Sequence, residues 1–195
     1  MRPDVGALLR CDDPLPGRPQ RVLIAGTSGS GKTTLAARIG RLLGVEHVEI
    51  DALFHGPGWT PRPSFVADVE EFSARQAWTT EWQYSAVRDL LAQRCDLMVW
   101  LDPPHATVMR QVTARTLRRR ARREILWNGN LEPPLRAILT DRDHIVRWAW
   151  RTRYATAERV ELLRHRRPGL PVVRLRSRAE TDLWVAGPLT RSAGD

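Results

Sequence analysis

Cysteine is scarce in this chain of 195 residues, where Cys11 and Cys95 are the only two. The N-terminus carries no apolar stretch of the kind found in secretory signals, so we expect both to be free thiols in a reducing cytoplasm. The chain also lacks any run of about 18 apolar residues, so we expect no membrane-spanning helix. Two cysteines and five scattered histidines form no grouping that is typical of a metal site.

Lysine is scarcer still, because Lys32 stands alone beside 30 arginines. The base-recognition motif of GTPases, N-K-x-D, needs a second lysine, so a GTPase switch is not expected. Arginine has replaced lysine everywhere else, and this indicates that position 32 requires a compact ammonium group. The formal net charge of +9 points to anionic partners, and both nucleotides and nucleic acids fit that description.

The single lysine lies in the stretch G-T-S-G-S-G-K-T, residues 26–33, which matches the phosphate-loop pattern G-x-x-x-x-G-K-[ST]. The expected strand 21–25, which is apolar from Val22 onward, precedes the loop, and apolar residues at helical spacing follow it. In this context the loop N–H groups surround phosphates at the positive end of a helix. The sequence therefore predicts an ATP site with Mg²⁺, in which Lys32 reaches the β- and γ-phosphates and the Thr33 hydroxyl binds the metal. The expected nucleotide-binding residues are Gly26, Thr27, Ser28, Gly29, Ser30, Gly31, Lys32, Thr33 and Thr34.

Strand-like and helix-like stretches alternate along the chain, which predicts a parallel sheet with helices on both faces. We expect a single domain over 20–187 with the three-layer α/β fold of P-loop NTPases and a five-stranded sheet. Residues 1–19 are rich in proline and are interpreted as a flexible leader, and 188–195 as a polar tail. The expected strands are 21–25, 45–50, 78–81, 97–101 and 172–175, and long helical stretches are expected at 136–165 and 178–186.

Three acids, Asp51, Glu81 and Asp102, each follow an expected strand. Ligands bind at the carboxyl ends of the strands in such sheets, so these side chains are expected to face one crevice. Asp51 is the candidate to orient or deprotonate an acceptor hydroxyl. Asp102 follows an apolar run and resembles a Walker-B acid, so it and Glu81 remain alternatives for the acid on the magnesium side.

The remaining candidates are aromatic and basic side chains. His55 and Trp59 lie in a loop rich in proline and glycine and, with Tyr84, are expected to line an acceptor pocket. Arg115, Arg119 and Arg123 recur every four residues and would share one helix face. We expect one or two of them to contact phosphates of the bound nucleotide. A basic helix of this kind also fits a surface that binds nucleic acid.

Several stretches together resemble a known group of proteins. They are I-D-A-L-F-H-G-P-G-W-T-P at 50–61, W-T-T-E-W-Q-Y-S at 78–85, V-W-L-D-P-P at 99–104 and R-T-L-R-R-R from 115. With the phosphate loop, they resemble the adenylate-kinase-like topology modulation proteins of the nucleoside-monophosphate-kinase branch. The resemblance implies an acceptor region at 52–77, an arginine-rich lid at 115–131, a magnesium-side role for Glu81 and an adenine-side role for 176–178. The group usually shows W-I-I-D-G-N-Y where this chain has W-T-T-E-W-Q-Y, so Glu81 and Trp82 replace an aspartate and a glycine.

These observations predict an ATP-dependent phosphotransferase, a small kinase that acts on a small hydroxylated or phosphorylated acceptor. The alternative is a protein without kinase activity, either a regulator gated by nucleotide or a nucleic-acid-binding P-loop protein. The sequence names neither the acceptor nor the oligomeric state.

Overall fold

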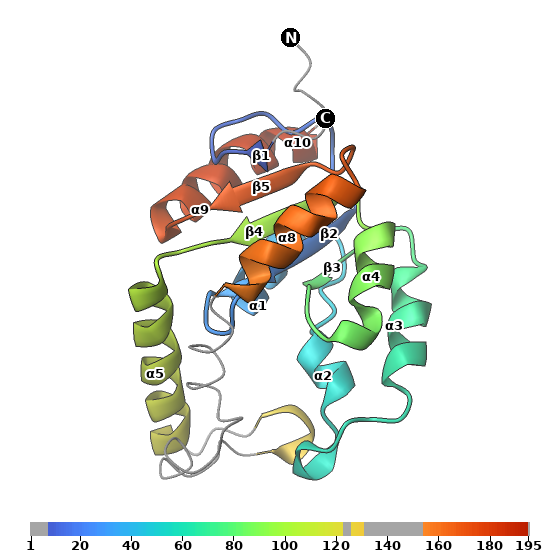
Figure 1. The fold of residues 1–195 in the computed structure, drawn as a ribbon, viewed down its shortest axis with the longest axis vertical. Coiled ribbons are helices and arrows are strands. Elements are labelled where there is room, and N and C mark those ends of the chain that lie inside the picture. The colour runs from blue at the N-terminus through green and yellow to red at the C-terminus, as the bar shows by residue number, and fades with distance from the viewer. Residues whose placement is uncertain (1–7, 123–125, 131–153, 195) are drawn as a thin grey trace.

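The computed structural model describes residues 8–122, 126–130 and 154–194 of the chain. Its centre is a sheet of five parallel strands in the order β1-β5-β4-β2-β3 (Figure 1). This confirms the predicted α/β fold with a five-stranded parallel sheet. The strands are β1 (Leu8–Leu9), β2 (Arg21–Gly26), β3 (Trp78–Glu81), β4 (Leu97–Leu101) and β5 (Val172–Leu175).

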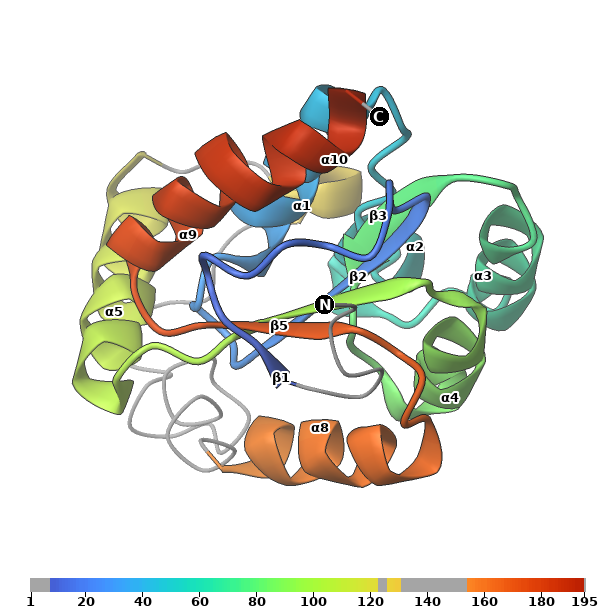
Figure 2. The same cartoon turned by 90° about the horizontal axis from the view of Figure 1, so that it is seen from above.

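Helices cover both faces of this sheet, as the view from above makes clear (Figure 2). One face carries α1 (Lys32–Leu43), α9 (Arg178–Trp184) and α10 (Thr190–Gly194). The other carries α4 (Ser85–Arg94) and α8 (Ala155–Arg166), with α3 (Phe65–Ser73) packed beside α4. The remaining described elements are α2 (Ile50–Phe54), α5 (His105–Arg122) and the short helical turns η1 (Pro57–Trp59), η2 (Trp127–Gly129) and η3 (Val185–Leu189).

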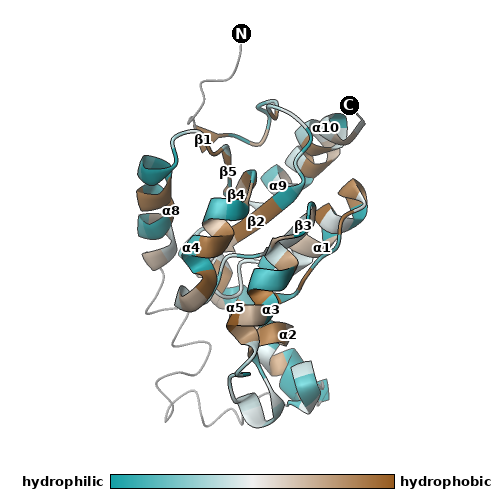
Figure 3. Cartoon of the chain, turned by 90° about the vertical axis from the view of Figure 1, so that its right-hand side faces the viewer, coloured by the Kyte–Doolittle hydropathy of each residue, from teal (hydrophilic) through white to brown (hydrophobic). Residues whose placement is uncertain are grey.

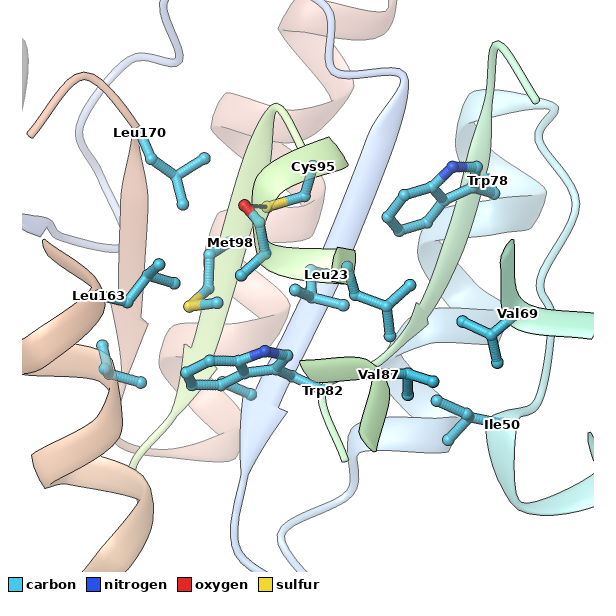
Figure 4. Close-up of a cluster of buried hydrophobic side chains, with 14 of the residues drawn as sticks. Leu23, Ile50, Val69, Trp78, Trp82, Val87, Cys95, Met98, Leu163 and Leu170 are labelled. Atoms are coloured by element: carbon cyan, nitrogen blue, oxygen red, sulfur yellow. Dashed lines mark hydrogen bonds between the residues drawn. The ribbon is translucent and has the colours of Figure 1, made fainter. Parts of the chain in front are cut away.

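Two clusters of apolar side chains fill the spaces between sheet and helices. Figure 3 shows β2 in the colour of apolar residues between helices that carry both apolar and polar faces. The cluster under α3, α4 and α8 contains Trp78, Met98 and Leu163 (Figure 4). Trp82, which stands where the group named above usually has a glycine, belongs to this cluster and is 7% exposed. Its bulk therefore packs in the core.

The N-terminal leader predicted for 1–19 contains a strand. Leu8 and Leu9 form β1, which pairs in parallel with Val172 and Val173 of β5. Leu9 is 5% exposed and packs in the cluster under α1 and α9. A strand of two residues has too little periodicity to be read from sequence, so only its partner at the edge of the sheet reveals it.

Replacing Leu9 by alanine is expected to lower the free energy of unfolding by about 2–3 kcal/mol, because a buried leucine loses its contacts and leaves a cavity. Leu183 is 55% exposed and provides a matched control, for which the same substitution should change stability by less than about 0.5 kcal/mol. Urea unfolding monitored by tryptophan fluorescence compares the two variants. Equal stability of both would contradict a structural role for β1.

The strand predicted for 45–50 is absent, and this prediction was wrong. Only His47 makes a bridge, to Thr79 of β3, and the chain then turns into α2 at Ile50. The physical reason is the carboxylate of Glu81, whose Oε2 accepts the N–H of Ile50 at 3.1 Å. A ladder would need that N–H, so pairing along β3 stops there. The sheet still has five strands because β1 pairs with β5 at the opposite edge.

The C-terminal end also differs from the predicted polar tail. Helix α9 runs into the π-helical turn η3, which contains Pro188, and then into α10. Leu189 is fully buried in the cluster under α1, so this end of the chain belongs to the core. In the predicted helix 136–165, residues 155–165 lie in α8, and most of the rest is outside the described residues. Within the described ranges, no helix has both the length and the apolar character needed to cross a bilayer.

Candidate functional site

The phosphate loop lies where predicted, between the end of β2 and the start of α1. Ser30 N–H donates to the carbonyl of Thr27 at 3.1 Å, which closes a tight turn. A Cβ at Gly26 would lie 2.4 Å from Ser30 Oγ and 3.1 Å from the carbonyl oxygen of Leu101, so this position requires glycine. Gly31 has φ +97°, a left-handed conformation that glycine adopts without strain. Glycine therefore occurs in the sequence at the two positions of this turn where the backbone allows no larger residue without strain.

Lys32 is buried at the base of the loop, with 7% of its surface exposed. Its ammonium donates to the carbonyl oxygen of Thr27 at 3.1 Å. Burial lowers the pKa of Lys32 to about 8, and the positive charge of Arg115 acts in the same direction, whereas Asp51 and Glu81 oppose it. A cation buried in this way is only partly compensated, and an anion bound in the loop would stabilise it.

Glu81, at the end of β3, is 1% exposed and lies at the centre of a network of hydrogen bonds. Its carboxylate contacts His47 Nε2 at 3.1 Å and accepts the Ile50 N–H and the Thr33 hydroxyl. Burial acts to raise the pKa of Glu81, but these donors outweigh it and the pKa lies below its usual value. The network joins β3 to the first turn of α1, next to Lys32.

Asp102 follows β4 at the same edge of the sheet but has a different partner. Its carboxylate accepts hydrogen bonds from Nε of Arg174 at 2.8 Å and from Nη2 of the same guanidinium. The Arg174 guanidinium also lies 4.5 Å from the ring centre of Trp100. The carboxylate is therefore engaged with β5, whereas Glu81 contacts the phosphate-loop helix.

Asp51 lies in the first turn of α2 and accepts two side-chain hydrogen bonds. Gln83 Nε2 donates to its Oδ1 at 3.0 Å and Tyr84 Oη at 2.5 Å. Tyr84 has φ +53°, an uncommon backbone conformation for a tyrosine. Burial and the nearby charge of Asp51 raise the pKa of Tyr84, so the hydroxyl stays protonated and serves as a donor.

The arginines that were predicted to contact phosphates have different surroundings along α5. A Cβ at Gly29 would lie 2.9 Å from Cβ of Val112, so the base of α5 touches the phosphate loop. Arg115, one turn further on, is half-buried and close enough for its charge to lower the pKa of Lys32. The Arg119 guanidinium lies 5.8 Å from the ring centre of Trp127. Arg123 lies outside the described residues.

His55 and Trp59, both predicted to line the acceptor pocket, lie together with ring centres 5.0 Å apart. His55 Nε2 is 3.2 Å from Tyr84 Oη, which connects this pair to Asp51. Burial lowers the pKa of His55, opposed by the charge of Asp51. The predicted residues Asp51, His55, Trp59 and Tyr84 thus form one continuous set of contacts.

Sequence reasoning missed other residues of this site, chiefly Trp127 and Asn130. The stretch W-N-G-N, residues 127–130, falls within 115–131, which the family resemblance assigned to an arginine-rich lid. It folds onto the loop around 55–60, where Figure 1 shows η2 beside η1. A tryptophan between turn-forming residues was the available signal, since such a side chain needs a packing partner. Glu49 and His47 were also missed, because nothing local marks them.

Comparison with known proteins gives results for structure only. No family model matches this chain, and no curated protein sequence matches it. A sugar kinase from a Janibacter species superposes with a TM-score of 0.50 at 22% identity, over 86% of this chain and 91% of that one. This chain has the fold of a P-loop kinase. A gluconokinase from Sinorhizobium meliloti has a TM-score of 0.48 at 18% identity, over 93% of this chain and 96% of that one. A shikimate kinase from Acinetobacter baumannii, solved with shikimate, has a TM-score of 0.48 at 19% identity, over 86% of this chain and 89% of that one.

Proposed function

We propose that this protein is an ATP-dependent phosphotransferase, a small kinase that transfers the γ-phosphoryl group of ATP to a hydroxyl group of a small molecule. The observation that carries the proposal is the position of Asp51. Its charge acts on Lys32 of the phosphate loop, and its carboxylate is held by Gln83 and Tyr84. A phosphate-binding cation and an oriented carboxylate at one edge of the sheet are what phosphoryl transfer to a hydroxyl requires.

The donor side fits a triphosphate on an observation independent of the motif. Ser30 Oγ is buried and has no hydrogen-bond partner among the described residues. A buried hydroxyl without a partner is costly, and a phosphate oxygen in the loop would satisfy it. Lys32 would then exchange the Thr27 carbonyl for phosphate oxygens. Arg115 and Arg119 would neutralise charge that spreads over the transferred group. The same role for Arg123 is a prediction from its spacing in the sequence.

The residues present also fit Mg²⁺. The Thr33 hydroxyl lies against the Glu81 carboxylate, and these are the hard oxygen donors that this ion prefers. We assign Thr33 as its protein ligand and Glu81 to its outer shell. Bound there, the ion would supply charge neutralisation between the phosphates. Asp102 is a weaker candidate, since Arg174 already engages its carboxylate.

In the transfer step, the acceptor hydroxyl attacks the γ-phosphorus and Asp51 takes its proton. A new O–P bond forms as the bond from the γ-phosphorus to its bridging oxygen breaks, and ADP leaves with that electron pair. The donors on Gln83 and Tyr84 hold the Asp51 carboxylate in the orientation that the attack needs. Closure of α5 over the nucleotide would exclude water that competes with the acceptor.

The finer grouping with the topology modulation proteins is part of this proposal. It is supported by the motifs at 50–61 and 78–85, whose residues include Asp51, His55, Trp59 and Tyr84. An adenine-side role for 176–178, which follow β5, rests on the same resemblance. It fits the course of the chain, because α9 begins at Arg178 at the carboxyl edge of the sheet.

ATP affinity is expected to decrease as the pH rises above about 8. Lys32 has a pKa of about 8 without ligand, so below that pH its ammonium is present, and above it binding must take up a proton. The apparent dissociation constant should rise by up to about tenfold per pH unit above 8. Calorimetry across pH 7 to 9.5 measures this. The Lys32→Arg variant should bind more weakly and without the pH dependence, because arginine stays charged. A flat wild-type profile would contradict this prediction.

The direct test of the proposed function uses γ-labelled ATP, Mg²⁺ and pools of nucleosides, nucleotides, sugars and other hydroxylated metabolites. Transfer of label to any member supports a kinase, and fractionating that pool identifies the acceptor. Intact ATP binding with no labelled product in any pool would contradict the proposal.

Nucleic-acid binding is a second candidate function, favoured by exposed arginines near the C-terminal end of α5. These are Arg118, Arg120 and Arg122. If they bind phosphodiesters, affinity for RNA or DNA should fall steeply with salt. Reversing these three charges should then abolish that binding and leave ATP affinity unchanged.

A further inference from the structure

The loop that follows Asp51 carries aromatic rings that meet a ring from a distant part of the chain. His55 and Trp127 stack with an interplanar angle of 22° and ring centres 5.9 Å apart. Trp59 meets both rings edge-on, at 5.0 Å from His55 and 6.2 Å from Trp127. Phe54 stacks on Tyr84 at 4.0 Å, which continues the aromatic wall to the hydroxyl that contacts Asp51. We call Phe54, His55, Trp59, Tyr84 and Trp127 the aromatic box.

Hydrogen bonds fix Trp127 in this box. Asn130 is 4% exposed, and its Oδ1 accepts the Trp59 N–H at 3.0 Å. Its Nδ2 donates to the carbonyl oxygens of Gly56 at 2.9 Å and Trp127 at 2.8 Å. Asn128 Nδ2 also donates to the His55 carbonyl. The turn at 126–130 therefore belongs to the acceptor side of the site, although the sequence assigned it to a lid over ATP.

The described charges beside the box differ between its two sides: the Arg119 guanidinium lies 5.8 Å from the ring centre of Trp127, and carboxylates lie on the side of Asp51. Glu49 accepts a hydrogen bond from the Trp127 side chain, and Asp51 and Glu81 lie nearby. Burial raises the pKa of Glu49, and the charges of Glu81 and Asp51 raise it further. Arg62 of the acceptor region is bound to Asp68 at 3.0 Å and to the Leu53 carbonyl at 3.3 Å. Lys32 and Arg115 lie on the phosphate-loop side.

One buried atom of the box lacks a partner. Tyr84 donates its hydroxyl proton to Asp51, so its oxygen accepts from His55 Nε2, which must carry the proton. His55 Nδ1 is then a bare acceptor, and it is buried with no hydrogen-bond partner among the described residues. A hydroxyl group of a ligand would satisfy it.

From this geometry we propose that the acceptor is a hydroxylated ring compound without phosphate or carboxylate groups, of the sugar, cyclitol or nucleoside class. Its ring lies against the faces of Trp59 and Trp127, one hydroxyl donates to His55 Nδ1 and the reacting hydroxyl faces Asp51. Aromatic walls with a few placed polar groups are typical of sites for such ligands. Like charge on Glu49 and Asp51 would repel an anionic acceptor. The inference rests on the proposed function and narrows it.

The test compares neutral compounds with anions of the same skeleton. Three such pairs are glucose and glucuronate, adenosine and AMP, and myo-inositol and inositol monophosphate. Transfer from labelled ATP is measured for each, and equilibrium binding is measured by calorimetry with β,γ-methylene-ATP present. We expect at least about a tenfold preference for the neutral member of any pair that binds. Preference for the anion, or no binding by any neutral member, overturns the inference.

Variants locate the site of recognition. Trp127→Ala should weaken binding of the neutral acceptor about tenfold, Trp127→Phe should restore it to within about threefold, and ATP affinity should not change. Glu49→Gln should reduce discrimination against the anion. Glu46→Gln is its matched control, because Glu46 is exposed and paired with Arg75 at 2.6 Å. An unaltered preference in Glu49→Gln, or unaltered acceptor binding in Trp127→Ala, overturns the inference.

The proposed kinase activity and the inference about the acceptor can be contradicted by different results. Binding of neutral compounds that depends on Trp127, without transfer of label, supports the inference and contradicts the kinase. Transfer to anionic acceptors alone supports the kinase and overturns the inference.

Discussion

Replacing Lys32 by alanine is expected to reduce phosphoryl transfer by at least about 100- to 1,000-fold and to weaken ATP binding strongly. The ammonium is the only buried cation at the phosphate loop among the described residues, and its hydrogen bond to Thr27 holds it there. Its loss leaves the β- and γ-phosphates without their nearest counter-charge. Calorimetry with Mg²⁺ and ATP, together with the labelled-ATP assay, measures both effects.

The control for this variant removes a positive charge from the same helix at a distance from the loop. Arg38 lies on α1, is partly exposed and pairs with Asp182. Arg38→Ala should leave ATP affinity within about twofold of wild type, since a surface ion pair contributes little. Normal ATP binding by Lys32→Ala would refute the assignment of residues 26–34 as a nucleotide site.

Replacing Asp51 by asparagine is expected to lower the rate of transfer by about 100- to 10,000-fold while ATP affinity stays within about threefold. Asparagine has the same shape and retains an oxygen for the donors on Gln83 and Tyr84, so the pocket keeps its geometry. It cannot take the proton of the acceptor. Single-turnover measurements of transfer, with calorimetry for ATP, separate chemistry from binding.

Asp68→Asn is the matched control for that variant. Asp68 lies on α3, where it pairs with Arg62 and accepts from Ser64 Oγ at 3.0 Å. Its replacement should change the rate by less than about threefold. Transfer that survives in Asp51→Asn, with the control unaffected, would show that another group accepts the proton.

The phosphate loop was predictable because its requirements are local. Gly26 and Gly31 are required by the sterics of one turn. The strand before the turn and the helix after it adjoin it directly in the sequence, so a single short stretch encodes the whole feature. The acids were predictable only in part. Their positions after expected strands indicate the carboxyl edge of the sheet, but the partner of each acid comes from a distant part of the chain. Arg174 for Asp102 and His47 for Glu81 lie 72 and 34 residues away along the chain.

The sheet provides a similar contrast. Apolar runs at 22–25 and 97–101 predict strands, because a strand that is buried on both faces consists mainly of apolar residues. The edges carry no such mark. Whether 45–50 or Leu8–Leu9 joins the sheet depends on Glu81, which takes the Ile50 N–H, and on β5, which offers the other edge.

By itself, the amino-acid sequence determined the class of fold, the phosphate loop and the set of acids and aromatic residues from which a site can be built. Each of these is encoded in a short stretch, through glycine sterics, the alternation of strands and helices, or a repeat of residue types. Only the tertiary structure decided which edge strand completes the sheet, which acid lies beside Thr33, and that Trp127 lies against His55. Contacts between residues far apart in the chain depend on how helices, strands and turns pack against one another, and a local sequence pattern does not specify that packing.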